Sequence, residues 1–366
     1  MNKPDAPSFQ GNKIDCRLIA EWEPQDAILV AWPHRFSDWA PILQEAEHCF
    51  ANIITAITPF VPVVLLHHGD KQLAHFFSAE VLKRIRFIQV PFNDTWVRDY
   101  AFLSFEREHQ KAVADFNFNG WGLKYAAALD NQVNRYLFES KKIFASTTFF
   151  DNKKSFTLEG GGIESNGHGI VLLNRYWLDQ PNRNDGLSIE DREKKIGEML
   201  GARKVITVDI PSLVGDDTDG HIDTIARFID EKSIAYVAPS DPASPNYPKL
   251  RKLEIELQRL QDEKGAYFRL VPLPDVGSYT DEGGELLPAT YANFLFAGDA
   301  LIVPTYQRKS LDNDALATLR EALPSRVVVG VNATTLVKWH GSIHCSTMQI
   351  AKGILSQDLL TTKNIL

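Results

Sequence analysis

The chain has 366 residues, 44% of them hydrophobic and 23% charged, and a formal net charge of −8; this length allows one large or two smaller domains, and the negative charge disfavours nucleic acid while suiting a cationic substrate. No apolar run is long enough to span a membrane, and the polar residues 1–10 lack a signal-peptide core, so no membrane association is expected. The three cysteines, Cys16, Cys49 and Cys345, offer neither a disulfide framework nor a zinc-binding CxxC pair, which favours the cytoplasm.

Hydrophobic spacing in the first quarter of the chain predicts alternating strands and helices. Strands are expected at 26–32, 61–66 and 86–90, and helices at 42–57 and 76–85. From residue 101 onward, a pattern of hairpin, helix and strand recurs with a period of roughly 50 to 70 residues.

Four such units follow one another, each with two hairpin strands, a helix and a third strand. They are 101–105, 111–116, 131–141 and 143–150; 163–166, 169–173, 189–200 and 204–210; 224–229, 233–238, 249–263 and 267–273; and 292–296, 300–305, 312–323 and 327–331. The last strand, 346–350, has no partner downstream and is predicted to pair with 26–32, which completes a fifth unit across the termini. Five α/β units that close on themselves form a ring without a large exposed sheet edge.

Residues with charged, imidazole or thiol side chains come directly before the first hairpin strand of these units, so they occupy the same position in each repeat. If the units are related by rotation, these strand entrances point at a common axis, where three carboxylates, two histidines and a cysteine converge. Scattered polar residues rarely share one phase of a repeat, so we interpret the convergence as a site. The residues concerned are Arg98 and Asp99, Glu159 before the glycines 160–162, His221 and Asp223, residues 289–291, and His344 and Cys345.

The segment 215–223 contains four aspartates and His221 directly before a predicted strand. Acidic residues and an imidazole held by rigid backbone favour a site that binds a cation and moves protons. A solvated acidic turn is the alternative. A calcium loop fits poorly, because the EF-hand register would place Gly215 first and Ala226 twelfth, where carboxylates are required.

Cys345 follows a polar, glycine-containing loop at a strand entrance, where a nearby cation could lower its pKa and give a thiolate. Cys49, by contrast, lies on the apolar face of a predicted helix and is interpreted as a small buried hydrophobe. His344 need not be the catalytic base, because adjacent residues of a strand face opposite sides.

Asp99 is either half of a surface ion pair with Arg98 or a carboxylate that grips a planar cation through two hydrogen bonds. Asp223 could be a second carboxylate of this kind. Trp96 and Trp121 are interpreted as core residues or as rings that stack on a cation. Glu159 could orient an imidazole, and its glycine run does not match a phosphate-binding fingerprint.

With these residues in place, the sequence resembles the agmatine deiminase family, which includes bacterial peptidyl-arginine-deiminase-type members and lies within the guanidine-modifying pentein superfamily. The ordered set of motifs covers nearly the whole chain: 21–24 (EWEP), 31–34 (AWPH), 94–99 (DTWVRD), 117–122 (NFNGWG), 158–161 (LEGG), 216–223 (DDTDGHID) and 343–345 (IHC). The resemblance implies a five-bladed pentein α/β propeller of pseudo-five-fold hairpin-helix-strand (ββαβ) repeats. It also implies one catalytic domain over residues 1–366, with a short N-terminal extension of about 18 residues.

The implied activity is that of a cytoplasmic agmatine deiminase, a hydrolase of linear amidines that converts agmatine to N-carbamoylputrescine and ammonia in putrescine and polyamine metabolism. Cys345 would form a covalent amidino intermediate, Asp99 and Asp223 would hold the guanidinium, and His221, oriented by Glu159, would exchange protons. No metal or cofactor is expected, the partner is a small cationic guanidine, and a homodimer is left open. Substrate contacts are expected from Trp96, Asp94, Trp121, Asp217 and Asn293.

The sequence departs from the family pattern at residues 100–102 (YAF), where a small residue and Gly-Pro are usual, and at 339–342 (WHGS), where a glycine-rich run is usual. Both departures touch the expected pocket wall and leave the catalytic groups. Agmatine is favoured over arginine because residues 117–119 supply no cation for an arginine carboxylate, with Lys124 and Arg175 left open as substitutes.

Three other readings stay open at this point. The first is another enzyme of the same chemistry, a peptidyl-arginine or free-arginine deiminase or an amidino transferase. The second is a non-catalytic binding protein of the same fold. The third is a cysteine peptidase, which needs only a Cys-His pair and leaves the carboxylates unexplained. Residues 275–285 could be a mobile lid or a plain surface loop.

Overall fold

The computed structural model describes residues 16–69, 73–140 and 143–361, and these residues form five small mixed sheets. In each sheet, the first two strands are antiparallel and a third strand joins in parallel after a helical crossover. The predicted recurrence of hairpin, helix and strand is therefore confirmed. The strands are β5 (Leu103–Arg107), β6 (Gln110–Asn117) and β7 (Phe149–Thr157); β8 (Ile163–Ser165), β9 (Ile170–Asn174) and β10 (Lys204–Val208); β11 (Ala226–Asp230), β12 (Ser233–Val237) and β13 (Arg269–Leu273); β14 (Leu295–Ala297), β15 (Ala300–Thr305) and β16 (Val327–Asn332); and β17 (Thr347–Ala351), β2 (Gln25–Ala31) and β3 (Val63–His67).

The fifth sheet joins the two ends of the chain, as predicted. β17 pairs antiparallel with β2, and β2 pairs parallel with β3, which carries an extra parallel strand, β4 (Ile85–Gln89). A second extra strand, β1 (Cys16–Leu18), pairs antiparallel with β5. β1 lies at the end of the predicted N-terminal extension of about 18 residues, and the rest of that extension lies outside the described residues.

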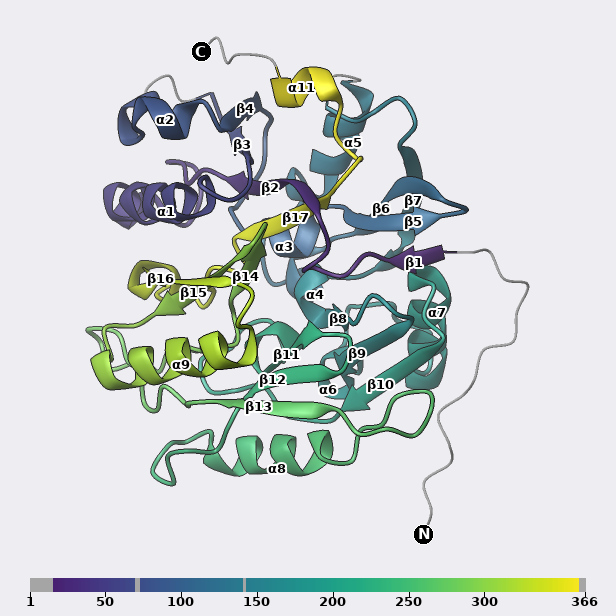
Figure 1. Ribbon diagram of the computed structural model, residues 1–366, viewed down its shortest axis with the longest axis vertical. Helices are drawn as coiled ribbons and strands as arrows, with labels where there is room; N and C mark the ends of the chain where they lie inside the picture. Colours follow the sequence, from purple (N-terminus) through teal and green to yellow (C-terminus); the bar gives the residue numbers. More distant parts are fainter. Residues whose placement is uncertain (1–15, 70–72, 141–142, 362–366) are drawn as a thin grey trace.

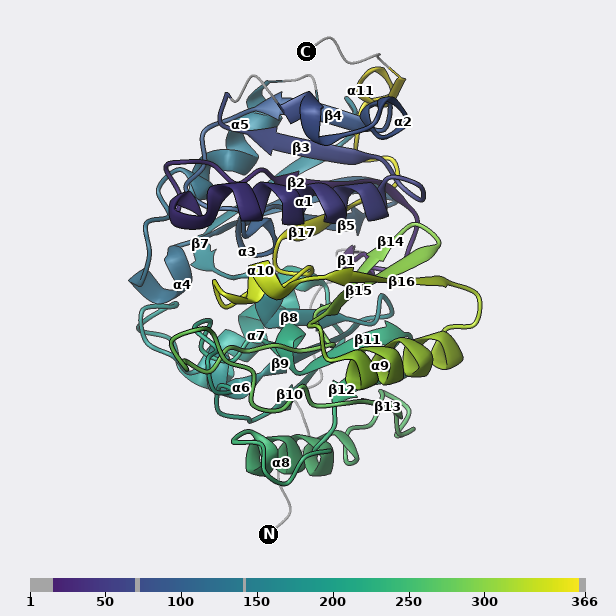
Figure 2. The same cartoon turned by 90° about the vertical axis from the view of Figure 1, so that its left-hand side faces the viewer.

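One long helix forms the crossover of each unit, and these helices lie toward the outside of the molecule while β17 and α3 lie near its centre (Figure 1). Figure 2 shows α1 lying along the upper sheets, with α9 and α8 below. The crossover helices are α1 (Leu43–Ile57), α5 (Val133–Glu139), α7 (Ile189–Leu200), α8 (Tyr247–Leu257) and α9 (Lys309–Ala322). Shorter helical turns are α2 (Ala79–Leu82), α3 (Val97–Tyr100), α4 (Gly120–Leu123), α6 (Arg175–Leu178), α10 (Thr334–Val337), α11 (Gln357–Thr361) and the 3₁₀ turns η1 (Ala40–Ile42), η2 (Leu73–Phe76), η3 (Asp130–Gln132), η4 (Gly160–Gly162) and η5 (Ile222–Thr224).

α7 illustrates why these helices form where they do. The Ser188 hydroxyl caps the first turn by accepting a hydrogen bond from the Asp191 amide, and Gly201 ends the helix with a left-handed φ of 65°. The helix buries Arg192, Ile196 and Leu200 on one face and exposes Glu190, Asp191, Lys194 and Glu198 on the other. Within the described ranges, every helix is too short or too polar to cross a bilayer.

Two predicted elements differ from the structure. The strand expected at 143–150 begins only at Phe149 and continues to Thr157, because residues 143–145 instead bond to the C-terminal segment through Ala145 N to Ile354 O (2.8 Å) and Ser356 N to Ile143 O (2.8 Å). β7 is a sheet edge, and its half-exposed polar residues hide the strand pattern. The helix expected at 76–85 shrinks to α2, which Ser78 caps, and residues 141–142 lie outside the described part.

Candidate active site

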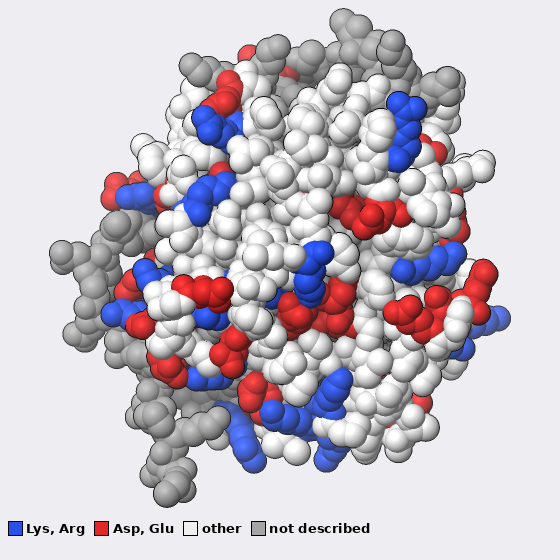
Figure 3. Space-filling model, turned by 180° about the vertical axis from the view of Figure 1, so that it is seen from behind, with Lys and Arg blue, Asp and Glu red and all other residues white. Residues whose placement is uncertain are grey.

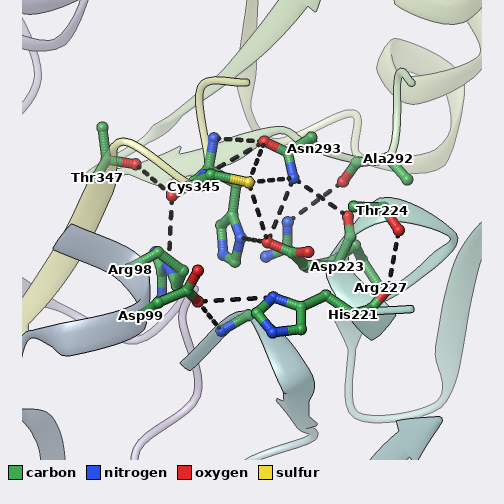
Figure 4. Close-up of polar contacts among 12 residues, drawn as sticks. Arg98, Asp99, His221, Asp223, Thr224, Arg227, Ala292, Asn293, Cys345 and Thr347 are labelled. Atoms are coloured by element: carbon green, nitrogen blue, oxygen red, sulfur yellow. Dashed lines mark hydrogen bonds and ion pairs between the residues drawn. The ribbon is translucent and has the colours of Figure 1, made fainter. Parts of the chain in front are cut away.

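The strand entrances of the five units meet in one buried cluster, which confirms the convergence predicted from the repeat (Figure 4). Each contributing side chain sits on a short turn directly before the first strand of its sheet, so the sheet fixes the turn and the turn aims the side chain. These side chains are Asp99 on α3, Glu159 before η4, His221 and Asp223 at η5, Asn293 before β14, and Cys345 before β17.

Cys345 is buried but borders a cavity, and its sulfur faces polar atoms. The Asn293 amide nitrogen donates to Sγ at 3.2 Å, and the Asp223 Oδ2 atom lies 3.6 Å from Sγ. Burial raises the pKa of the thiol well above its usual value, and the carboxylates of Asp223 and Asp99 add to that effect. Without a cation in the cavity, the sulfur is therefore a thiol.

His221 lies between two carboxylates, with Nδ1 at 3.6 Å from Asp99 Oδ1 and Nε2 at 3.5 Å from Glu159 Oε2. Burial alone would lower the pKa of this imidazole, but Asp99, Glu159 and Asp223 outweigh it and raise the pKa to about 9. The ring is therefore an imidazolium at neutral pH. Gly161 lies so close that a Cβ atom there would stand 2.6 Å from His221 Nδ1, so only glycine fits this position.

Asp99 is held by two donors from different elements. The Gly161 amide donates to Oδ1 at 2.9 Å, and the Trp121 indole donates to Oδ2 at 2.8 Å. Burial raises the pKa of Asp99 to about 6, a shift that the nearby Asp223 and Glu159 carboxylates reinforce and that His221 opposes.

Asp223 is fully buried, and its Oδ2 atom accepts from His344 Nδ1 at 2.7 Å and from the Asn293 amide at 3.3 Å. Burial would raise the pKa of this carboxyl, but the hydrogen bond and charge of His344, with help from His221, lower it below its usual value. Asp223 therefore stays ionised, whereas Asp99 titrates nearer to neutrality.

Glu159 is held by Arg183, a residue that the sequence reasoning missed. Arg183 Nε lies 2.8 Å from Oε1 and 2.9 Å from Oε2, and the Trp177 indole donates to Oε2 at 2.8 Å. Burial would raise the pKa of Glu159, but Arg183 and His221 lower it to about 2. Arg183 also bonds Asp219 Oδ2 at 2.7 Å, so it ties Glu159 to the acidic loop at 215–223.

The cavity beside Cys345, together with the solvent-open space at its mouth, occupies about 510 Å³ and is lined by aromatic rings and carboxylates. Burial raises the pKa of Asp94 to about 7, and burial also raises the pKa of Asp217, whose Oδ2 accepts from the Tyr125 hydroxyl at 3.1 Å. Among the described residues, no lysine or arginine lines it. The lining residues are Asp38, Asp94, Trp96, Asp99, Trp121, Tyr125, Asp217, Thr218, Trp339, His340, Gly341 and Cys345.

Four of the five expected substrate contacts, Trp96, Asp94, Trp121 and Asp217, line this cavity, and Asn293 does not. Asn293 lies behind the wall, where its side-chain oxygen also accepts from the His344 and Cys345 amides at 3.0 and 3.3 Å. The residues of the two sequence departures divide in the same way. Trp339, His340 and Gly341 line the cavity, with His340 Nδ1 2.8 Å from Gly215 O, and Tyr100 is buried outside it.

Lys124 and Arg175, the two cations left open for a substrate carboxylate, are engaged elsewhere. Lys124 bonds the Asp217 carbonyl and lies 3.1 Å from Asp219, and Arg175 pairs with Glu190 at 2.7 Å. The sequence also gave no sign of Asp38 and Tyr125, which lie in loops away from the strand entrances.

Comparison with known proteins places the chain in a family. A model of the family described as Porphyromonas-type peptidyl-arginine deiminase matches residues 17–351. The chain belongs to this deiminase family. Its relatives include proteins named for agmatine deimination as well as for arginine deimination, so the family is one of hydrolases that act on C–N bonds of guanidino groups.

Two solved structures of relatives superpose over most of the chain. A Porphyromonas gingivalis protein, provisionally named an arginine deiminase, is 40% identical, covers 93% of this chain and 100% of its own, and gives a TM-score of 0.88. The C. jejuni agmatine deiminase, in a structure with substrate bound, is 34% identical, covers 95% of this chain and 99% of its own, and gives a TM-score of 0.85. A Legionella pneumophila protein, provisionally named an agmatine deiminase, is 32% identical over 96% of this chain and 98% of its own.

Proposed function

We propose that this deiminase-family protein is an agmatine deiminase, which hydrolyses agmatine to N-carbamoylputrescine and ammonia. The observation that carries the proposal is the charge of the cavity wall. Four aspartates line it, and no lysine or arginine does so among the described residues. Agmatine is cationic at both ends and suits such a wall, whereas free arginine or a C-terminal arginine would bring a carboxylate that finds no cation there.

In the proposed reaction, Asp99 and Asp223 hold the nitrogens of the guanidinium and fix its plane beside Cys345. As the guanidinium binds, the Cys345 thiol loses its proton to solvent; the thiolate then forms a bond to the central carbon, and the His221 imidazolium gives a proton to the nitrogen that leaves as ammonia. A water molecule, deprotonated by His221, then attacks the amidino-thioether. The adduct that forms then breaks its C–S bond, which releases N-carbamoylputrescine and regenerates the Cys345 thiolate. The reaction therefore consumes one water and involves no oxidation or reduction.

The protonation states of the unliganded site support this order of events. Cys345 is a thiol because burial and the carboxylates of Asp223 and Asp99 raise its pKa. A bound guanidinium would neutralise those carboxylates and so favour the thiolate in its presence. His221, with a pKa of about 9, already carries the proton that departing ammonia requires, and Glu159 holds the imidazole in place.

We extend the proposal to the architecture and to the far end of the substrate. The five mixed sheets would be the blades of one pentein propeller domain whose axis passes through the site, and a homodimer stays compatible with it. Asp94 and Asp217 would face the ammonium end of agmatine, with Trp96 and Trp121 as the aromatic walls. Nothing in this scheme calls for a metal or a cofactor.

The decisive experiment measures ammonia release from agmatine, arginine and a peptide ending in arginine, with wild type and Cys345→Ser. Release from agmatine that Cys345→Ser abolishes supports the proposal. Butylguanidine, which is agmatine without its amine, serves as the matched substrate: Asp217→Asn should raise KM for agmatine more than for butylguanidine.

A peptidyl-arginine or free-arginine deiminase is the second candidate, because the 40% identical Porphyromonas gingivalis protein carries an arginine deiminase name. Ammonia release from the arginine compounds and none from agmatine would establish that candidate and overturn the assigned substrate. No release from any guanidine would overturn the activity itself and leave a binding protein of the same fold.

A further inference from the structure

His344 is fully buried and lies directly behind the proposed substrate-holding carboxylate. Its Nδ1 atom is 2.7 Å from Asp223 Oδ2, and its Nε2 atom is 2.8 Å from Glu21 Oε1. The alternation of side chains along a strand predicts that His344 faces away from Cys345. The ring does lie outside the cavity wall, yet it reaches the site from behind through Asp223.

Glu21, which contacts the Nε2 atom of His344, is itself held by three hydrogen-bond donors. Its carboxylate accepts from Arg98 Nη1 at 2.9 Å, from Arg227 Nη2 at 2.5 Å and from the Gln349 amide at 2.9 Å. These donors come from α3, β11 and β17, so Glu21 is held by three units of the fold at once.

The charges of this cluster nearly balance. Three carboxylates, Glu21, Glu164 and Asp223, face two guanidinium groups, Arg98 and Arg227. Burial raises the pKa of Glu164 to about 8 although Arg227 opposes the shift, so at neutral pH Glu21 and Asp223 balance the two guanidinium groups. Glu21, Glu164 and His344 lie close enough to share a metal ion, but Arg227 already supplies the cation at that place.

The contacts of the ring indicate where its proton lies. Burial and the charges of Arg227 and Arg98 lower the pKa of His344, so the ring carries a single proton at neutral pH. A carboxylate oxygen only accepts hydrogen bonds, so this proton can serve either Asp223 or Glu21, and Glu21 already accepts from Arg98, Arg227 and Gln349. With the proton on Nδ1, His344 donates to Asp223, and Glu21 lies against the other side of the ring.

We propose that His344, held by Glu21, is a positioning residue that keeps the Asp223 carboxylate ionised and aimed at the guanidinium. The inference deepens the proposed function, because it assigns the support of one of the two carboxylates that would hold the substrate. His344 acts through Asp223 and touches neither the cavity nor the reacting carbon.

The expected consequence is a change in pH dependence. Burial raises the pKa of Asp223, and the hydrogen bond from His344 is the largest opposing cause. Without that bond, Asp223 takes up a proton at higher pH and no longer attracts a cation. In wild type, Asp99 with its pKa of about 6 sets the acid limb of kcat/KM, which reports the free enzyme. A raised pKa of Asp223 adds a second protonation to this limb, which should therefore become steeper and move to higher pH. The other groups that face Asp223 are Asn293, Cys345, His221, Arg227 and Asp99, and those that face His344 are Glu21, Arg98 and Arg227.

Two amide variants distinguish a positioning role of His344 from a role in packing alone. In His344→Asn the amide nitrogen lies near the position of Nδ1 and can still donate to Asp223. In His344→Gln it lies near Nε2, which retains a contact to Glu21 and loses the donor to Asp223. We expect His344→Gln to move the acid limb upward by about one pH unit or more, with a loss of kcat/KM of about tenfold or more at pH 6, and His344→Asn to move it much less.

A second measurement tests the same role of His344 without relying on catalytic activity. The urea midpoint of each variant, measured from pH 4 to pH 8, reports the cost of an ionised Asp223 that lacks its donor. His344→Gln should fall further below wild type as the pH rises, because the unpaired carboxylate ionises, and His344→Asn should follow the wild-type profile more closely.

Equal losses in both variants, with unchanged pH profiles, would overturn the inference and leave His344 as a packing residue. If the wild-type protein releases ammonia from no guanidine, the proposed function fails. The urea profiles then decide this inference alone: divergence of His344→Gln from His344→Asn with rising pH supports it, and parallel profiles overturn it.

Discussion

Arg183 is the residue on which the protonation of Glu159 depends most, and it lies in the loop between α6 and α7. Glu159 is completely buried, and a carboxylate there is tolerable only with its cation beside it. The arginine in turn is only 3% exposed and bridges to Asp219 and to the Thr218 carbonyl. The pair therefore joins the proposed base-orienting residue to the loop that carries His221.

We expect Arg183→Met to destabilise the protein by about 3–5 kcal/mol at pH 7, because it leaves Glu159 buried without its cation. The folded-state pKa of Glu159 is about 2, below its usual value near 4.5, so in wild type its stabilising contribution is present above pH 4.5 and is lost as the pH falls toward 2. The deficit of the variant should thus be full at pH 7 and narrow below pH 4.5. Urea unfolding across this pH range measures it.

Arg175→Met is the matched control, because Arg175 pairs with Glu190 and Glu193 on a more exposed surface and should cost about 0–1 kcal/mol. A second check is Arg183→Met combined with Glu159→Gln, which removes the buried charge and should recover much of the loss. An Arg183→Met deficit no larger than that of Arg175→Met would contradict the assignment of Arg183.

At this scale, the repeat allowed the prediction of the groups that sit at strand entrances, and the motifs added four of the residues that line the cavity, Asp94, Trp96, Trp121 and Asp217. Asp99, Glu159, His221, Asp223 and Cys345 share one phase of the repeat, and the structure brings all of them together. Arg183 lies in an irregular loop with no phase of its own. The signal that could have found it is charge balance, since three buried carboxylates beside one imidazole call for a further cation.

α4 is the element with the most unusual backbone. Its four residues all have positive φ values: Gly120 at 71°, Trp121 at 54°, Gly122 at 78° and Leu123 at 70°. A left-handed conformation costs a residue with a Cβ atom about 1–2 kcal/mol. This turn places the Trp121 indole on Asp99 Oδ2, so the backbone strain lies beside the proposed substrate site.

Leu123 carries such strain without a visible packing benefit, because its side chain is 69% exposed. We expect Leu123→Gly to raise the free energy of unfolding by about 0.5–1 kcal/mol, since the relief of the Cβ penalty exceeds the entropy cost of a new glycine. Leu123→Ala keeps the penalty and should change stability little. Equal unfolding free energies for the two variants in urea would contradict this account of α4.

Elements with strong patterns could be predicted from the sequence, and those held by partners far along the chain could not. The helices α1, α7 and α9 and the hairpins of the last three units lie close to their expected positions, because apolar spacing reports their buried faces. β7 was misplaced because a polar edge strand lacks such spacing. α4 was not foreseen, because only its two glycines mark a left-handed turn.

The molecule as a whole depends on the joining of its two ends. β17 begins two residues after Cys345 and pairs with β2, so the strand that closes the fifth sheet also anchors the proposed nucleophile. On the face opposite to the one seen in Figure 1, acidic and basic side chains are interspersed rather than separated (Figure 3). The closure across the termini was predictable because the last strand had no other partner. The layout of the aspartate-lined cavity could not be predicted, because Asp38 and Tyr125 come from irregular loops.

Asp26 offers the sharpest test of this closure. It lies on β2, and its Oδ2 atom accepts from the Gly353 and Leu355 amides, both at 2.9 Å, just beyond the end of β17. Asp26→Ala leaves two backbone donors without their acceptor and should lower the free energy of unfolding by about 2–4 kcal/mol. Asp26→Asn retains an acceptor oxygen and should cost less.

Because β17 anchors Cys345, we expect Asp26→Ala to lower the rate of ammonia release as well, although Asp26 does not line the cavity. Circular dichroism and tryptophan fluorescence should report one coincident urea transition at a lower midpoint, since a ring of five sheets opened at one joint loses support in all of them. Asp314→Ala, on the exposed face of α9, is the control and should stay within about 0.5 kcal/mol of wild type. If Asp26→Ala matched that control in both stability and rate, the closure at β17 would be dispensable, and the position of Cys345 would have to depend on Asn293 and the loop before it.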